Sequence, residues 1–142
     1  MITDSHEQVQ QIPWLLTRFV QQTSGVTDAV CDSSDGLLMA MSTELDRGRA
    51  DQFAAIAAGL TSLSLGASRC FGYGEVEQVM VEMSTGFLFV ASISDGSCLG
   101  ILTDKSADVG LVGYEMTMLV DRFGDALTPQ VRAGLRSALA VG

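Results

Sequence analysis

The chain is organised around the segment RADQFAAIAAGLTSLSLG, residues 49–66, which no proline interrupts. Its periodicity predicts one helix, with residues 45–48 as the loop that leads into it. At about 100° per residue, apolar side chains fall on one broad face that is wide enough to lie on a sheet. That face holds Phe53, Ile56, Ala57, Leu60 and Leu63. We therefore expect this helix to pack on a β-sheet.

The opposite face of this helix is made of small residues, where a surface helix would carry Lys and Glu. It holds Asp51, Ala54, Ala55, Ala58, Ser62 and Leu65, of which only Asp51 is charged. Small side chains on such a face indicate that another backbone comes close to it. Either the chain's own backbone buries both sides of the helix, or a second polypeptide packs above it. We favour the second explanation, with the chain's own sheet below the helix.

The composition is typical of one globular domain. With 142 residues, 47% of them hydrophobic and 18% charged, the chain is long enough for a full core and too apolar to be disordered. We expect a flexible polar tail over residues 1–8 and a single domain over residues 9–142. The net charge of −9 disfavours nucleic acid and anionic membranes as partners, and it favours a partner with a basic patch.

No targeting or membrane segment is visible in the sequence. The N-terminal residues are polar and acidic, unlike a signal peptide, and no apolar run approaches the roughly 20 residues of a membrane span. The three cysteines, Cys31, Cys70 and Cys98, are widely spaced and are expected to be buried, reduced thiols. We therefore expect a cytoplasmic protein without direct membrane insertion.

Helices and strands can be assigned along the rest of the chain. Residues 12–22 form a helix that either starts near Ile12 or is kinked by Pro13. A hairpin around DSSDG and a later three-stranded meander are predicted, with residues 68–74 as a link between the halves. The predicted strands are residues 26–31, 37–41, 75–83, 87–93 and 98–103. A helix then runs to about Phe123, and Thr128-Pro129 opens a last short helix.

The sequence offers little for catalysis. Its only histidine, His6, lies in the N-terminal tail, so a Ser-His-Asp or Cys-His arrangement is not expected. Asp32 and Asp35 lack the spacing of a calcium loop and are expected to be turn residues. The glycine-rich FGYG, residues 71–74, precedes a strand and has no following Lys-Ser/Thr, unlike a phosphate-binding loop. We predict no catalytic residue, no bound cofactor and no metal site.

Three motifs, in this order and spacing, resemble the roadblock/dynein-light-chain family. They are DSSDGLLMAMS, LDRGRADQFAAIAAGLTSLSLGA and VEMSTGFLFVASISDGSCLGIL. The resemblance covers roughly residues 9–135 and is closest to small stand-alone bacterial regulators encoded beside Ras-like GTPases and sensor kinases. It implies an α/β (α+β) sandwich with the order α-β-β-α-β-β-β-α. A five-stranded antiparallel sheet would carry the central helix on one face and the first and last helices on the other.

The resemblance also implies a homodimer, formed through the central helix and an edge strand over residues 75–83. The predicted interface combines the small-residue face of the helix with Val79, Val81 and Met83. Family members bind small GTPases, and some accelerate GTP hydrolysis while others are scaffolds. We therefore predict a non-catalytic regulator of a Ras-like small GTPase, in a signalling complex with a sensor histidine kinase. If it activates the GTPase, Arg47 and Arg49 are the candidate contacts, since an arginine supplied in trans can speed hydrolysis.

A second class of function stays open on the residues alone. A domain of this type can hold a small molecule between its sheet and a helix. Several glycines together with Met39, Met41, Met80 and Met83 could line such a pocket, although methionines are adaptable core fillers first. An autonomous enzyme is disfavoured because histidines are missing.

Overall fold

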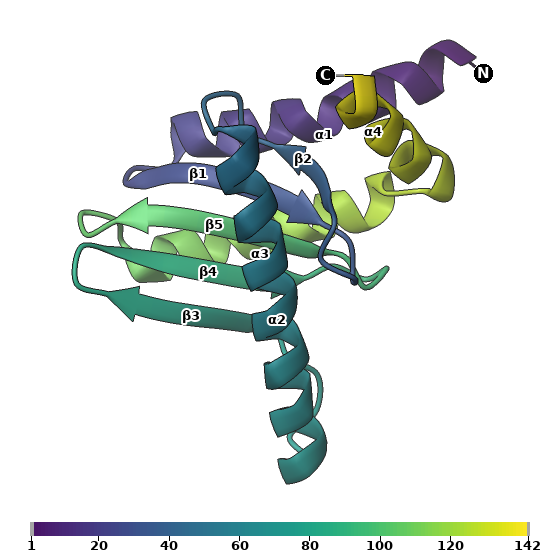
Figure 1. Cartoon of the computed structure of the whole chain (residues 1–142). Helices are drawn as coiled ribbons and strands as arrows, with labels where there is room; N and C mark the ends of the chain where they lie inside the picture. The colour runs from purple at the N-terminus through teal and green to yellow at the C-terminus, as the bar shows by residue number, and fades with distance from the viewer. Residues whose placement is uncertain (1, 142) are drawn as a thin grey trace.

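A five-stranded antiparallel sheet lies between helices on both of its faces (Figure 1). The computed structural model describes residues 2–141. Its elements are α1 (Ile2–Gln22), β1 (Val26–Asp32), β2 (Leu38–Met41), α2 (Arg47–Phe71), β3 (Gln78–Met83), β4 (Gly86–Ser92), β5 (Cys98–Asp104), α3 (Val109–Ala126) and α4 (Pro129–Val141). The strand order is β2-β1-β5-β4-β3, and each neighbouring pair is antiparallel. The predicted sandwich, with its short terminal helix, is confirmed.

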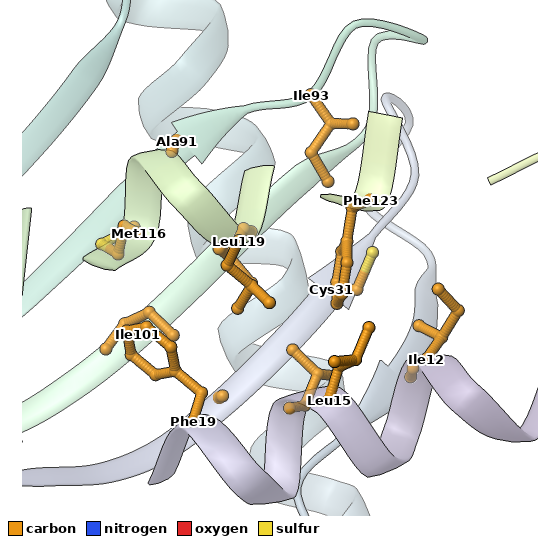
Figure 2. Close-up of a cluster of buried hydrophobic side chains, with 14 of the residues drawn as sticks. Ile12, Leu15, Phe19, Cys31, Ala91, Ile93, Ile101, Met116, Leu119 and Phe123 are labelled. Atoms are coloured by element: carbon orange, nitrogen blue, oxygen red, sulfur yellow. The ribbon is translucent and has the colours of Figure 1, made fainter. Parts of the chain in front are cut away.

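Helix α2 covers one face of the sheet, and α1 and α3 cover the other (Figure 1). The larger hydrophobic cluster lies on the side of α1 and α3, where their side chains meet those of the strands (Figure 2). Phe89 of β4, Phe123 of α3 and Ile12 of α1 are fully buried in it. Apolar burial on this side supplies most of the core that holds the sheet and its helices together.

Helix α2 is held on the sheet by close contact with a glycine. A Cβ atom built on Gly100 of β5 would lie 2.9 Å from Cζ of Phe53 and 3.0 Å from Cγ2 of Val30. Only a residue without a side chain leaves room for the Phe53 ring there. The buried residues of α2 are Ala50, Phe53, Ala54 and Ala57, all in the first half of the helix. None of residues 58–71 is buried, and this second half extends past the sheet (Figure 1).

Helix α2 is longer at both ends than the sequence predicted. It begins at Arg47, and the side chain of its N-cap, Asp46, accepts a hydrogen bond of 3.2 Å from the Arg49 N–H. It ends at Phe71, and its C-cap, Gly72, has φ +68° and donates its N–H to the carbonyl of Ser68 at 2.8 Å. Residues 68–71, predicted as part of a link, are therefore its last turn. The reason is that Gly72, and not Gly66, takes the left-handed conformation.

Helix α1 begins about ten residues before the predicted start near Ile12 and runs through Pro13. Residues 2–8, expected as a tail, are helical in the structure, while their flexibility stays a prediction and residue 1 lies outside the described chain. The early part of α1 gains a neighbour in α4. A Cβ atom on Gly134 of α4 would lie only 2.4 Å from Cγ2 of Val9. This packing partner is distant in sequence, so the local pattern could not indicate it.

The turn of the first hairpin lies against α2. Gly36 has φ +83°, as expected for the glycine that ends the predicted turn. A Cβ atom at this position would lie 3.3 Å from the Cβ of Ala58. A side chain on residue 36 would therefore meet both an unfavourable backbone conformation and a crowded neighbour.

We predict that Gly36→Val lowers the free energy of unfolding by about 1–3 kcal/mol, through positive φ and crowding of Ala58. Gly74→Val is the matched control, because Gly74 has φ +89° but no heavy atom within 4 Å of an added Cβ. Urea titration measures both variants. Equal losses of unfolding free energy in the two variants would show that the contact with Ala58 contributes nothing. An unchanged urea midpoint for Gly36→Val would show that the turn is misplaced.

Candidate interaction surface

Large apolar side chains remain exposed along α2 and β3. Leu63 is 76% exposed, and Tyr73 in the loop after α2 is 90% exposed. We define the α2–β3 surface as the six exposed residues Ile56, Leu63, Leu65, Phe71, Tyr73 and Met83. Met80 is exposed on the other face of the sheet, because it pairs with Phe89 of the cluster beneath α1 and α3. Large apolar side chains that stay exposed in one region of a protein often mark a binding surface. This surface is the candidate functional site.

The structure brings most of the predicted interface residues to this surface or its border. The exposed ones are Asp51, Ala55, Ser62, Leu65 and Met83. Val79 and Val81 are partly buried, because their side of β3 packs against the cluster beneath α2. Ala58 is partly buried beside the first hairpin. These residues share one side of the sheet, as the sequence predicted, and their role in an interface stays a prediction.

The prediction that Ala54 lies on the outer face was wrong. Ala54 is 0% exposed and belongs to the cluster between α2 and the sheet. The backbone that approaches the small residues of α2 is the chain's own first hairpin. A Cβ on Gly36 would lie 3.3 Å from Ala58 Cβ and 3.7 Å from Ala55 Cα. A second polypeptide is therefore not needed to explain these alanines.

Sequence reasoning also missed two surface residues. Ile56 and Leu63 were predicted to face the sheet, but Ile56 is 52% exposed and Leu63 is more so. The true inner face is centred on Ala50, Phe53 and Ala57 together with Ala54. These four residues stand at positions i, i+3, i+4 and i+7, so a signal existed in the sequence. This helical pattern of the inner face was hard to recognise, because three of its four residues are alanines and the larger Ile56 and Leu63 lie on the other side.

The two edges of the sheet differ in how they are protected. Strand β2 has only four residues, and both α1 and α4 pack beside it (Figure 1). Strand β3 has six residues and pairs only with β4. An uncovered edge presents unpaired backbone N–H and C=O groups that can pair with another strand. The open edge lies next to the exposed half of α2, so polar backbone and apolar side chains are offered together.

The two candidate arginines lie at the first turn of α2. The Arg47 Nε donates to Asp51 Oδ1 at 3.2 Å, and its Nη1 donates to the carbonyl of Leu139 in α4 at 3.3 Å. The Arg49 side chain is exposed and forms no ion pair within residues 6–140. A 25-residue helix is about 37 Å long, so both arginines lie far from Phe71 and Tyr73 at its other end.

Asp32 was predicted as a turn residue, but it ends β1 in the protein interior. It is 0% exposed, and neither of its carboxyl oxygens has a hydrogen-bond partner in the described part of the chain. Burial raises the pKa of Asp32 to about 8. The side chain is therefore mostly protonated at pH 7. Asp35 is a turn residue as predicted, and the hydrogen bond from the Ser33 hydroxyl lowers its pKa.

The cysteines differ in burial. Cys31 and Cys98 are buried, as predicted, and desolvation raises the pKa of both thiols. The Cys98 sulfur lies 3.3 Å from Thr61 Oγ1 of α2. Cys70 is exposed near the end of α2, so the expectation that all three are buried was wrong. Its position on the half of α2 that extends past the sheet explains the difference.

Within the described residues, no three His, Cys, Asp or Glu side chains are placed to hold a metal ion. Helix α2 is long and apolar enough, by length and composition alone, to cross a membrane. Core helices of soluble proteins share that property, so it is weak evidence. The exposed apolar groups and the open strand edge can bind another molecule, and these groups themselves do not make or break covalent bonds.

Comparison with known proteins places this arrangement in context. The family model of the Roadblock/LC7 domain matches residues 12–103, and no curated protein matches. A Roadblock/LC7 domain from Streptomyces avermitilis is 42% identical, covers 78% of this chain and 92% of its own, and has a TM-score of 0.74. Myxococcus xanthus MglB is 16% identical, with coverage of 81% and 93% and a TM-score of 0.74. The gliding protein MglB of Thermus thermophilus is 15% identical, with coverage of 86% and 90% and a TM-score of 0.72. At these low identities the two MglB structures show similarity of fold alone.

We predict that stability falls as the pH rises from about 5 to about 7, because only the folded state keeps a proton on Asp32 across this range. The ordinary pKa of Asp is about 3.9, so Asp32 should cost about 2–3 kcal/mol of unfolding free energy over these two pH units. Asp32→Asn cannot ionise and should flatten the profile, while the exposed Asp35→Asn should not. Urea titrations at several pH values measure this. Parallel profiles for wild type and Asp32→Asn would contradict the prediction.

Proposed function

We propose that this protein is a non-catalytic regulator that acts as a homodimer and binds a Ras-like small GTPase. The chain belongs to the Roadblock/LC7 domain family, and this membership supports the proposal. The observation that carries the proposal is the α2–β3 surface beside an open sheet edge. The GTPase partner rests on the family resemblance of the sequence motifs. We further propose that the protein works in the cytoplasm, without membrane insertion, in a signalling complex that includes a sensor histidine kinase.

The homodimer follows from the unequal edges of the sheet. Antiparallel pairing of β3 with β3 of a second copy satisfies the twofold symmetry of a dimer and continues the sheet. The same operation brings two α2 helices together on one face, where Ile56 and Leu63 would be covered. The edge at β2 cannot pair in this way, because α1 and α4 pack beside it.

The groove beside α2 supports a protein partner better than a small molecule. It has a volume of about 1400 Å³ and is lined by Thr61, Ser62 and Leu65 of α2, Tyr73 of the following loop and residues of α3, among others. Small-molecule sites are typically concave pockets of about 300–1,000 Å³ that enclose most of the ligand. This groove is larger and continuous with the apolar surface of α2. It gives the small-molecule alternative no specific support.

Of the two arginines, we propose Arg49 as the GTPase contact. Arg47 is held by Asp51 and by the last turns of α4, so it must break two interactions before it can reach a partner. Arg49 is exposed and has neither restraint within the described chain. A cation at this position would meet acidic or phosphate groups of a bound GTPase.

We predict that Leu63→Glu converts the homodimer into a monomer, because it places a charge in an apolar interface. At about 10 µM, wild type should have twice the 15.0 kDa chain mass by light scattering, and Leu63→Glu should have the single-chain mass. Ser137→Glu, on an exposed position of α4, adds the same charge as a control and should stay dimeric. Unchanged circular dichroism would show that Leu63→Glu is folded. A dimeric Leu63→Glu would place the interface elsewhere.

We predict that the protein retains a small GTPase from an extract of its source cells in one nucleotide state, GTP or GDP, and not in the other. With the purified GTPase, Arg49→Ala should weaken binding by about tenfold, and Arg47→Ala should weaken it less. Calorimetry measures both. The protein alone should neither bind nor hydrolyse GTP, because its sequence has no P-loop. Retention of no GTPase, or GTP binding by the protein alone, would contradict the proposal.

A further inference from the structure

Strand β3 lies at the open edge of the sheet (Figure 1) and carries a single charge. Of its six residues, QVMVEM, only Glu82 is charged. The Nζ of Lys105, in the loop between β5 and α3, donates to Glu82 Oε2 at 2.6 Å and lies 4.5 Å from the centre of the Phe87 ring. Lys105 is the only lysine of the chain. A charge on an edge strand usually discourages pairing, and here a neighbouring cation balances it.

Gln78, at the other end of β3, is also held by side-chain hydrogen bonds. Its Nε2 donates to the carbonyl of Gly113 at 2.9 Å and to Thr117 Oγ1 at 3.2 Å, both in α3. Alternate side chains of a strand point the same way, so Gln78, Met80 and Glu82 share the face of the sheet that α3 covers. Met80, between the two polar residues, is 48% exposed. On this face β3 therefore presents an amide, a thioether and a carboxylate in a row.

Symmetry limits the registers in which β3 can pair with β3 of a second copy, a step that rests on the proposed homodimer. A twofold axis perpendicular to the sheet keeps both α2 helices on one face, so residues directly opposite each other must point to the same face. One residue then lies on the axis, opposite itself. Only two registers pair five of the six residues of β3, and they place Met80 or Val81 on the axis.

The register with Val81 on the axis places each Glu82 opposite Met80 of the second copy. The ion pair between Glu82 and Lys105 is then removed from water beside a thioether, which satisfies the charged groups poorly. The two Glu82 residues also become diagonal neighbours, about 7–8 Å apart. On the α2 face, Val79 lies opposite Met83 of the second copy, and Val81 lies opposite itself. This register therefore contains three apolar pairs and two pairs of a charge with an apolar side chain.

The register with Met80 on the axis places each Glu82 opposite Gln78 of the second copy. The amide is a polar neighbour for the carboxylate, and the Lys105 ammonium has further N–H groups to donate to the amide oxygen. Met80 covers Met80 of the second copy, and Val79 lies opposite Val81 on the α2 face. The two registers thus contain equal numbers of apolar pairs, and they differ only in the residue that faces Glu82.

We infer that Lys105, Glu82 and Gln78 set the register of the β3 edge, so that β3 pairs with β3 of a second copy with Met80 on the twofold axis. Lys105 is a positioning residue in this pairing. It balances the Glu82 charge in its own copy and brings a hydrogen-bond donor to Gln78 of the other. Polar pairs of this kind fix the register, while the apolar pairs supply affinity in either register.

Cysteine cross-linking tests the register. Residues opposite each other on the axis have Cα atoms about 4.5–5.5 Å apart, within the range of a disulfide. With oxidised glutathione as the oxidant, Met80→Cys should form a covalent species of twice the 15.0 kDa chain mass on a non-reducing gel. Val81→Cys is the matched control and should stay a single chain. Both variants also carry Cys70→Ser, because Cys70 is exposed.

A charge-removal series tests the role of Lys105. Lys105→Met keeps an apolar side chain beside Phe87 but leaves Glu82 unbalanced, so it should raise the dimer dissociation constant about tenfold, since each dimer contains two such ion pairs. Adding Glu82→Gln should restore the dissociation constant, because the unbalanced charge is then gone. Arg136→Met removes the same charge from an exposed position of α4 and should leave it unchanged. Sedimentation over a range of concentrations measures all four proteins.

Light scattering of the unoxidised protein at about 10 µM separates failure of the register from failure of the homodimer. A protein of single-chain mass would remove the homodimer and the inference with it. A dimer that cross-links through Val81→Cys, or through neither cysteine, would keep the homodimer and overturn the register. A loss in Lys105→Met that Glu82→Gln does not restore would show that Lys105 acts through packing on Phe87, and it would overturn the role given to its charge.

Discussion

The contact between the Phe53 ring and the bare backbone of Gly100 sets how α2 lies on the sheet. Because the ring sits where a side chain on β5 would be, the rotation of the helix about its axis is determined at this point. Ala50, Ala54 and Ala57 then face the sheet, and Ile56 and Leu63 face outward. Gly36 of the first hairpin closes over Ala58 on the neighbouring side. The exposure of Ile56 and Leu63 on the α2–β3 surface is a consequence of this rotation.

The fold protects one of its two sheet edges and leaves the other open. The C-terminal helix α4 crosses beside β2, packs on α1 and reaches Arg47 at the start of α2. Nothing in the described chain lies along the free side of β3. The exposed half of α2 stands beside that free edge, so one region offers both backbone hydrogen-bonding groups and apolar area. An arrangement of this kind favours contact with another protein, and the groove beside it is larger than a typical small-molecule site.

The interior carries one group that opposes folding at neutral pH. Asp32 lies at the root of the first hairpin, is fully buried and has no hydrogen-bond partner among the described residues. It is tolerated because it keeps its proton, and the neighbouring thiols of Cys31 and Cys98 keep theirs for the same reason of burial. The protonated carboxyl is less costly than an ion would be, yet it makes stability depend on pH in a range where surface carboxylates do not titrate.

Local sequence determined the elements and their order. The DSSDG turn, the N-cap at Thr128 and the short turns of the meander each depend on residues close together in the chain, and the structure contains them all. The edge position of β3 also followed, through the family resemblance. Tertiary structure decided what depends on distant residues: Val9 in the early part of α1 packs on Gly134 of α4, and Asp32 is fully buried in the folded chain. It also decided the candidate surface, since both faces of α2 are apolar and the sequence allowed either to lie inward. Packing against Gly100 and Gly36 distinguished the two faces. Gly100 has no side chain and leaves room for the Phe53 ring, and Gly36 in the same way leaves room for Ala58.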